Sequence, residues 1–367
     1  MSHSVLVEPF DEWNEKLVQN VHPPGWQNPK PEGRYNLVVL GAGTGGLITA
    51  LIASSLGARV ALVERHLMGG DCLNVGCVPS KSVIRGAQII HEARQAARFG
   101  MPTSPEDPGD FGEVMRRMRE IRARISDEDS AERYRDEFGI DVHLGEARFD
   151  GEGRVVVDGE ALEYKNAVIA TGARAVAPPI QGLAEAGYLD NETVFELTER
   201  PRRLAVIGAG PIGCELAQAF RRLGSEVQIL ELMDQILIRE DPDAARIVQE
   251  SLVGDGVQMD FGCEIQRVER RGTEKIIALS CPEKGERELV VDEILIGAGR
   301  APNVENMGLE TVRVAFDARE GVRVDDTLRT TNRRIWAVGD VCMKWKFTHA
   351  ADAAAKIVVQ NALFSVG

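Results

Sequence analysis

Two segments of this 367-residue chain carry the same pattern of glycines at the same spacing. The stretch from Gly41 to Glu64 aligns without a gap with the stretch from Gly208 to Glu231, and nine of the 24 aligned positions are identical. An apolar run precedes each copy, which is typical of a buried parallel strand. Each copy then continues as a helix that ends at a glycine and as a second apolar strand. The repeat predicts two βαβ units, and therefore an α/β fold with two Rossmann-like domains.

Each copy contains the pattern G-x-G-x-x-G between its first strand and its helix, which is the context that a dinucleotide site requires. The first glycine makes the tight turn, the second lets the backbone approach a pyrophosphate, and the third lets the helix pack on the strand. The phosphates would bind at the positive end of the helix. Glu64 and Glu231 end the second strands, where each would accept hydrogen bonds from ribose hydroxyls. Tight turns without a ligand are the alternative, which the two acids disfavour. The predicted glycines are Gly41, Gly43 and Gly46, and Gly208, Gly210 and Gly213.

The charge balance excludes several classes of partner. The chain has 43 basic and 57 acidic residues, a net charge of −14 and a pI near 5.1. Such a chain repels nucleic acid and anionic membrane surfaces. It has no apolar run of about 18 residues, the length of a membrane span, and its acidic N-terminus does not resemble a secretory signal. We therefore expect a cytoplasmic protein. Glu231 and Asp234 would repel a 2′-phosphate, so we expect NADH rather than NADPH at the second site.

Cys72 and Cys77 stand close together after the first repeat. Their C-x4-C spacing does not fit a zinc site, and no His cluster completes four ligands, so we predict no metal site. Residues five apart on an ideal helix have Cα atoms about 8.6 Å apart, which exceeds the limit of about 7 Å for a disulfide. A bridge therefore requires a distorted turn, which Gly76 would allow. The pair is either a redox disulfide or two buried thiols. The other cysteines are expected to be single core residues: Cys214, Cys263, Cys281 and Cys342.

The block Gly69-Gly-Asp-Cys-Leu-Asn-Val-Gly-Cys-Val-Pro-Ser-Lys81 resembles the redox motif of the class I pyridine nucleotide–disulfide oxidoreductases. That family includes dihydrolipoamide dehydrogenase, glutathione reductase and mercuric reductase. The resemblance extends from about Tyr35 to the end of the chain and includes three further motifs: Ala170-Thr-Gly172, Gly299-Arg-Ala-Pro-Asn303 and Ala337-Val-Gly-Asp340. It implies a glutathione-reductase-like fold with FAD at the first repeat and NAD(P)H at the second.

The resemblance also implies roles for individual residues. Cys77 is the thiol that faces the flavin, and Cys72 is the interchange thiol that faces the substrate. Lys81 lies near the flavin N5 with Glu215 as its partner; without the resemblance, both would be read as surface charges. The N-terminus of a predicted helix over 348–363 would favour negative charge on the flavin. The remaining implied contacts are Thr171, Gly172, Asp340, His349 and Ala350 for FAD, and Gly299 for NAD.

The predicted organisation is an N-terminal extension (1–34), an FAD-binding domain in two segments (35–180 and 300–367) and an NAD(P)-binding domain between them (181–299), each domain with a small β-meander. Further expected elements are helices over 10–21, 79–100 and 111–138, strands over 142–149, 154–157 and 167–170, and a meander over 264–280 and 287–296. Family members continue into a dimerisation domain with a His–Glu pair. We expect a truncated chain that lacks this domain and whose full-length form is a homodimer.

The predicted activity passes a hydride from NAD(P)H through FAD to a Cys72–Cys77 disulfide, and on to a disulfide, a dithiol or a soft-metal substrate. Asp71, where relatives usually have Thr, and the segment from Lys346 to Asp352 look most like the mercuric-reductase branch. A dihydrolipoamide-dehydrogenase-like enzyme is the alternative within the family. A non-turnover FAD-binding fragment is the alternative from another class. The cysteine pair disfavours relatives that lack the disulfide.

Overall fold

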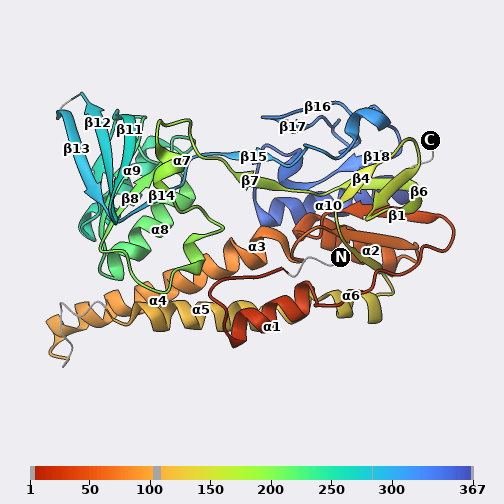
Figure 1. Cartoon of the computed structure of the whole chain (residues 1–367), viewed down its shortest axis with the longest axis horizontal. Coiled ribbons are helices and arrows are strands. Elements are labelled where there is room, and N and C mark those ends of the chain that lie inside the picture. Colours follow the sequence, from red (N-terminus) through yellow and green to blue (C-terminus); the bar gives the residue numbers. More distant parts are fainter. Residues whose placement is uncertain (1–4, 102–108, 283, 365–367) are drawn as a thin grey trace. The chain divides into compact units, whose positions relative to one another are not determined.

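The computed structural model describes residues 5–101, 109–282 and 284–364. The chain divides into two compact units (Figure 1). The first unit comprises the chain up to Asn74, Arg122–Arg174 and the chain from Arg300 onward; the second comprises Val75–Ile121 and Ala175–Gly299. The sequence assigned the segment Val75–Ile121 to the same domain as the first repeat, whereas in the structure it groups with the second.

The first unit is built on a parallel sheet that contains the first repeat. Its parallel strands follow the order β3 (Asp141–Leu144), β2 (Val60–Glu64), β1 (Tyr35–Leu40), β6 (Glu160–Ile169) and β18 (Ile335–Ala337). Helix α2 (Thr44–Ser55) connects β1 to β2 and packs against helix α10 (Thr348–Phe364). Strands β1 and β2 read as nearly continuous apolar runs because both faces of a parallel sheet are covered. The predicted βαβ unit and the C-terminal helix are confirmed.

The meander of the first unit has one more strand than predicted. The expected strand over 142–149 is divided by Gly145 into β3 and β4 (Ala147–Phe149). Strand β5 (Arg154–Val157) then pairs antiparallel with β4 and with the start of β6, through a turn at Asp158 and Gly159. Strand β6 therefore begins at Glu160, not at Ala167, since it belongs first to this hairpin and then to the parallel sheet.

The N-terminal segment belongs to the first unit. Asp11 caps helix α1 (Glu12–Val21), and its side chain accepts hydrogen bonds from the N–H groups of Trp13 and Asn14. Leu17 and Val21 are fully buried. The predicted helix over 10–21 is confirmed. The remaining elements of this unit are α3 (Gly70–Asn74), η2 (Ser126–Asp129), α6 (Ala131–Asp136), η4 (Leu309–Val312), β16 (Phe316–Asp317), β17 (Gly321–Val322) and η5 (Gly339–Val341).

The second repeat forms a four-stranded parallel sheet in the second unit. Its order is β10 (Gln258–Asp260), β9 (Glu226–Leu230), β8 (Arg203–Ile207) and β14 (Glu293–Ile296), with helices α8 (Pro211–Arg222) and α9 (Pro242–Gly254). A separate antiparallel sheet contains β11 (Glu264–Arg271), β12 (Glu274–Cys281) and β13 (Gly285–Val291). The predicted meander over 264–280 and 287–296 is confirmed as far as Val291, and the last part of that range is β14 of the parallel sheet. Asp292 separates β13 from β14, because its carboxylate accepts the N–H of Arg203 at 2.8 Å and aligns β14 with the parallel sheet.

The segment between the two repeats contains two long helices, α4 and α5. Helix α4 (Cys77–Ala96) ends in a short 3-10 turn, η1 (Ala97–Phe99), and packs on α8 through a shared apolar core. The predicted helix over 111–138 is interrupted: α5 (Phe111–Ile125) ends before η2, and Ser130 caps the separate helix α6. Short elements also include β7 (Ala173–Ala175), which pairs with β15 (Arg300–Pro302), α7 (Leu183–Ala186) and η3 (Val194–Glu196). No helix in the described ranges is both long and apolar enough to cross a bilayer.

Candidate functional site

The outer glycines of both fingerprints are required by the fold itself. Gly41 and Gly208 have φ angles of +101° and +99°, which L residues with a side chain rarely adopt. A Cβ at Gly46 would overlap the carbonyl oxygen of Gly41. A Cβ at Gly213 would overlap that of Gly208 in the same way. These four positions explain the turn and the packing of helix on strand, with or without a ligand.

The middle glycines have no such structural reason. Gly43 and Gly210 have φ angles of −78° and −72°, which any residue adopts. A Cβ at Gly43 would lie 3.7 Å from its nearest neighbour, the Cα of Gly70. A Cβ at Gly210 would lie 3.7 Å from the Gly297 carbonyl oxygen. Both are ordinary contacts. A group that approaches the backbone closely, as a pyrophosphate does, accounts for glycine at these two positions.

Both glycines begin helices that lack a capping side chain. Gly43 precedes α2 and Gly210 precedes α8, and neither cap has a side-chain acceptor. The first N–H groups of a helix have no partner within the helix, and its dipole places positive charge there. Each helix has 12 residues. The chain around both turns therefore fits the phosphates of a dinucleotide.

Glu64 and Glu231 occupy equivalent positions in the two repeats. One oxygen of Glu64 accepts the N–H of Ala42 at 2.7 Å, and the other accepts that of His66 at 2.8 Å. Glu231 accepts the N–H of Ala209 at 2.7 Å and that of Met233 at 3.0 Å. Burial raises the pKa of Glu64 above its usual range. Each carboxylate is held beside its fingerprint turn and keeps further lone pairs for ribose hydroxyls.

The loop that carries Cys72 packs directly on the first fingerprint. The Gly69 N–H donates to the Ala42 carbonyl at 2.8 Å. Gly70 has a φ of +56°, and a Cβ there would lie 2.6 Å from the Cα of Gly43. The Asn74 side chain donates to the carbonyls of Met68 and Gly70 at 3.0 and 2.9 Å. The sequence pattern gave no reason to expect Asn74 as an anchor of this loop.

A buried arginine fastens the same loop. Arg122 donates to the Asn74 carbonyl and to the Asn14 side chain, both at 2.7 Å. It lies in the arginine-rich stretch of α5, which the sequence analysis did not single out. Sequence reasoning therefore missed a residue that connects the loop after Cys72 to helix α1.

Cys72 and Cys77 lie in different helices. Cys72 is half-buried in α3, which ends at Asn74, and the exposed Cys77 is the first residue of α4. Gly76 caps α4 with φ −134° and ψ −113°, so the chain is not one helix across the pair. This break is the distortion that a bridge would require. Cys72 belongs to the first unit and Cys77 to the second, and their pairing stays a prediction.

The motifs Ala170-Thr-Gly172 and Gly299-Arg-Ala-Pro-Asn303 are joined by hydrogen bonds in the first unit. The Thr171 hydroxyl donates to the Asn303 carbonyl at 2.7 Å, and the Asn303 side chain donates to the Thr171 carbonyl at 2.8 Å. The Asn303 N–H also donates to the Gly172 carbonyl at 3.0 Å. Thr171 and Gly172 follow β6 after Ala170, at the carboxyl end of the sheet, where ligands of such sheets bind.

Arg300 connects the Cys72 loop with the predicted FAD residue Asp340. Its guanidinium pairs with Asp71, donates to the Ala173 carbonyl at 2.6 Å and lies 3.7 Å from an Asp340 oxygen. Burial raises the pKa of Asp340, and Arg300 and Lys346 oppose that rise. Sequence reasoning quoted the motif around Arg300 but gave this residue no role. The G-R-x-P-N pattern was the signal available for it.

The predicted FAD contacts of the C-terminal segment lie near the fingerprint. A Cβ at Gly45 would be 3.1 Å from Val338, and one at Gly339 would be 3.7 Å from the Ala351 side chain. His349 and Ala350 are in the first turn of α10. The His349 ring stacks on that of Phe347, with 5.4 Å between the ring centroids. Asp340 and the start of α10 therefore lie beside the helix that follows the first fingerprint.

In the second unit, Lys81 and Glu215 form the predicted ion pair. The Lys81 ammonium on α4 is 2.8 Å from a Glu215 oxygen on α8. Both side chains are well exposed, so the pair contributes little to stability. Gly299, the predicted NAD contact, has a φ of +86° and open space around its Cα.

The prediction of four single core cysteines was wrong for two of them. Cys263 and Cys281 form a disulfide, because residues distant in sequence become neighbours across two antiparallel strands, which the one-dimensional spacing did not reveal. Cys214 is buried as expected, and burial raises its pKa to about 12.

The fold and this site define a class of protein with two dinucleotide-binding βαβ units. A family model described as "Pyridine nucleotide-disulphide oxidoreductase" matches residues 35–355. The chain belongs to this family, and membership implies FAD and a nicotinamide dinucleotide as cofactors.

Several relatives and solved structures are similar over most of the chain. A mercuric reductase of Staphylococcus aureus is 33% identical over 98% of this chain and 67% of its own length. A dihydrolipoyl dehydrogenase of Acholeplasma laidlawii is 31% identical over 90% of this chain. The HOCl-induced flavoprotein disulfide reductase RclA of Escherichia coli superposes with a TM-score of 0.79 at 29% identity, over 91% of this chain and 72% of RclA. The chain spans only 60% and 52% of two other mercuric reductases that it matches.

Proposed function

We propose that this chain binds FAD in the first unit and NADH in the second and transfers electrons to a Cys72–Cys77 disulfide. The observation that carries the proposal is the pair of middle glycines, Gly43 and Gly210, which the fold does not require. Each stands at an uncapped helix beside an anchored carboxylate. The cysteine loop packs on the first of these two turns.

The FAD, when bound, supplies the chemistry that accepts a hydride from dihydronicotinamide and passes an electron pair on to a disulfide. The chain's own residues bind and orient the reactants. The N–H groups at the start of α2 hold the phosphates, and Glu64 accepts from the ribose. Asp340, kept in place by Arg300, faces the flavin part. The N-terminus of α10, with His349 and Ala350, favours negative charge near it.

Lys81, Cys77 and Cys72 carry the later part of the proposed reaction. Lys81 contributes a positive charge that Glu215 holds in place. Cys77 is the thiol on the flavin side, and Cys72 is the thiol that meets the substrate and exchanges with it. Gly299 contacts the NADH, and the Glu231 carboxylate accepts hydrogen bonds from the hydroxyls of its ribose.

The substrate proposed first is a soft metal ion or a disulfide, as in a mercuric-reductase-like enzyme. Asp71 and the similarity to mercuric reductases support it. A dihydrolipoyl-dehydrogenase-like activity is the second candidate, because the dihydrolipoyl dehydrogenase 3 of Pseudomonas aeruginosa is 36% identical over 89% of this chain. We further propose that the protein is cytoplasmic and that its full-length form is a homodimer.

The proposal is tested with protein reconstituted with FAD under anaerobic conditions. NADH should bleach the flavin absorbance, and NADPH should bind at least tenfold more weakly. The reduced protein should then be re-oxidised by a model disulfide such as lipoamide or by Hg(II), and the preferred acceptor separates the two candidates. Protein that binds no FAD, or that NADH leaves unchanged, would refute the proposal.

A further inference from the structure

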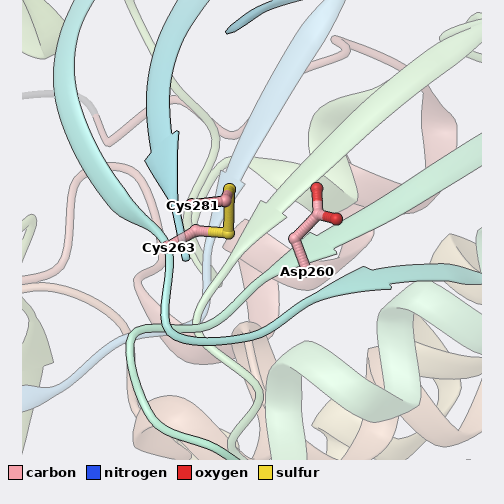
Figure 2. A group of neighbouring side chains, drawn as sticks. All are labelled: Asp260, Cys263 and Cys281. Carbon is pink, nitrogen blue, oxygen red and sulfur yellow. A yellow bond between two sulfur atoms is a disulfide. The ribbon is translucent and has the colours of Figure 1, made fainter. Parts of the chain in front are cut away.

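The Cys263–Cys281 disulfide joins two strands at their shared end. Cys263 directly precedes β11 and Cys281 ends β12, and the neighbouring residues Glu264 and Ser280 are paired in register. The two cysteines therefore occupy the next cross-strand position. Both are buried, with exposed fractions of 4% and 6%. Figure 2 shows the bridge beside the side chain of Asp260.

Asp260 is close enough to suggest a metal site, since one of its carboxylate oxygens and the two sulfurs lie within 4.8 Å of one another. Its ligand atoms are nevertheless occupied. One carboxylate oxygen is 2.5 Å from the Lys284 ammonium, and the other is bonded to Arg287 and Gln228. The two sulfurs are bonded to each other. The single carboxylate is therefore matched by two cations and its oxygens are occupied, which favours a structural link over metal binding.

The link leads to the predicted ribose-binding residue. The Glu231 N–H donates to the Asp260 carbonyl at 2.9 Å, and the Cys263 N–H donates to the Glu231 carbonyl at 3.3 Å. The Gly262 N–H donates to the Met233 carbonyl at 3.1 Å. The backbone from Asp260 to Cys263 thus lies along the segment that positions the Glu231 carboxylate beside the fingerprint turn.

The first repeat holds its equivalent glutamate in another way. Strand β3 pairs with β2 from Ala61 up to Glu64 itself, which stands opposite Leu144. Strand β10 pairs with β9 only as far as Leu230, one residue before Glu231. The second glutamate therefore lies beyond the end of its parallel ladder, and the disulfide ties down the segment that runs beside it.

We propose that the Cys263–Cys281 disulfide is a covalent positioning element of the dinucleotide site in the second unit. It holds the segment Asp260–Cys263, and through it Glu231, so that NADH affinity depends on the state of the bridge. The inference rests on the proposed function, in which Glu231 accepts the ribose hydroxyls.

Opening the bridge requires a dithiol reductant. One thiolate of the dithiol attacks a cysteine sulfur, the S–S bond breaks, and a mixed disulfide forms. The second thiol then closes the reductant into a disulfide. Two electrons and two protons remain on Cys263 and Cys281, which become thiols. The backbone hydrogen bonds persist, but the segment loses its covalent link to β12.

The experiment measures NADH binding to the FAD-loaded protein by fluorescence titration. In the Cys263→Ser/Cys281→Ser variant, we expect the Kd for NADH to rise about threefold to tenfold, with FAD content unchanged. Ile277→Val is the matched control, since it removes one buried methylene from the same sheet and keeps the bridge. We expect it to leave the Kd unchanged.

A double-mutant cycle with Glu231→Gln separates positioning from general loosening. If the bridge acts through Glu231, breaking it has no further effect on the Kd once Glu231 is replaced. An unchanged Kd without the bridge, when Glu231→Gln alone weakens binding, would overturn this inference and leave the proposed function intact. A Glu231→Gln variant with unchanged affinity would instead refute the role of Glu231 in the proposed function.

Two further measurements cover a variant that fails to fold and the alternative of a metal site. If the serine variant fails to fold, wild-type protein reduced with dithiothreitol gives the same comparison, in a Cys72→Ser/Cys77→Ser background that removes the other thiol pair. The reduced wild type is also titrated with Cd²⁺. Stoichiometric binding that Asp260→Asn abolishes would overturn the inference, because the cluster would then be a metal site.

Discussion

Replacing the middle glycines with alanine should remove one dinucleotide at a time without harming the fold. Gly43 and Gly210 have ordinary φ angles and room for a Cβ, with the nearest atoms at 3.7 Å. Alanine there should leave the apoprotein as stable or more stable by about 0.4–1 kcal/mol, because it restricts the unfolded chain. In the bound state, the methyl group would keep the pyrophosphate from the backbone.

The expected loss is that of one hydrogen bond to a charged group, about 1.5–3 kcal/mol. This corresponds to about a 10- to 100-fold rise in Kd. Gly43→Ala should therefore weaken FAD binding and leave NADH binding in place, and Gly210→Ala should do the reverse. Flavin fluorescence, NADH titration and urea unfolding of the apoprotein measure the three quantities.

Alanine substitutions at two other glycines, Gly46 and Gly254, serve as controls. Gly46→Ala places a Cβ on the Gly41 carbonyl oxygen, so it should destabilise the apoprotein by about 1–3 kcal/mol. Gly254→Ala, where an added Cβ would meet no atom, should stabilise the apoprotein by at most about 1 kcal/mol and leave the binding of both dinucleotides unchanged. The reasoning is refuted if Gly43→Ala unfolds the apoprotein, or if it binds FAD as tightly as wild type.

Three further predictions concern single side chains. Burial lowers the pKa of His143 to about 4, and neither ring nitrogen has a hydrogen-bond partner among the described residues. The free energy of unfolding should therefore fall by up to about 3 kcal/mol as the pH drops from 6.5 toward 4. Urea titrations at pH 7.5 and 4.5 should show this loss in wild type and not in His143→Leu. Lys81→Met should change stability by less than about 1 kcal/mol yet slow NADH-driven disulfide reduction at least tenfold, whereas Lys356→Met, which breaks a comparably exposed pair, should slow nothing. Arg300→Leu should raise the Kd for FAD about tenfold, since Asp71 and Asp340 lose their shared cation; an unchanged Kd would contradict that role.

Short-range patterns were enough to predict the two βαβ units. The glycine spacing, the apolar runs and the terminal glutamates each reflect a local requirement of turn, strand or ligand, and the structure confirms the units. The ion pair between Lys81 and Glu215 was predicted only from the resemblance to a family, since the residues by themselves indicate surface charges.

The errors came from interactions between distant segments. The chain leaves the meander for the parallel sheet at Asp292, which pairs with Arg203, 89 residues away. Cys263 and Cys281 meet only when β11 and β12 pair. Arg122 is buried because Asn14 and Asn74 approach it from other parts of the chain. No local periodicity encodes such contacts.

The central claim is that electrons from NADH arrive at Cys72 and Cys77. The direct measurement is anaerobic incubation of the FAD-loaded protein with NADH, followed by alkylation with N-ethylmaleimide and mass mapping of the labelled cysteines. The account predicts that NADH creates two new alkylation sites, at Cys72 and Cys77, and that labelling of Cys263 and Cys281 does not increase. Bleaching of the flavin with no new labelling at Cys72 and Cys77 would contradict it.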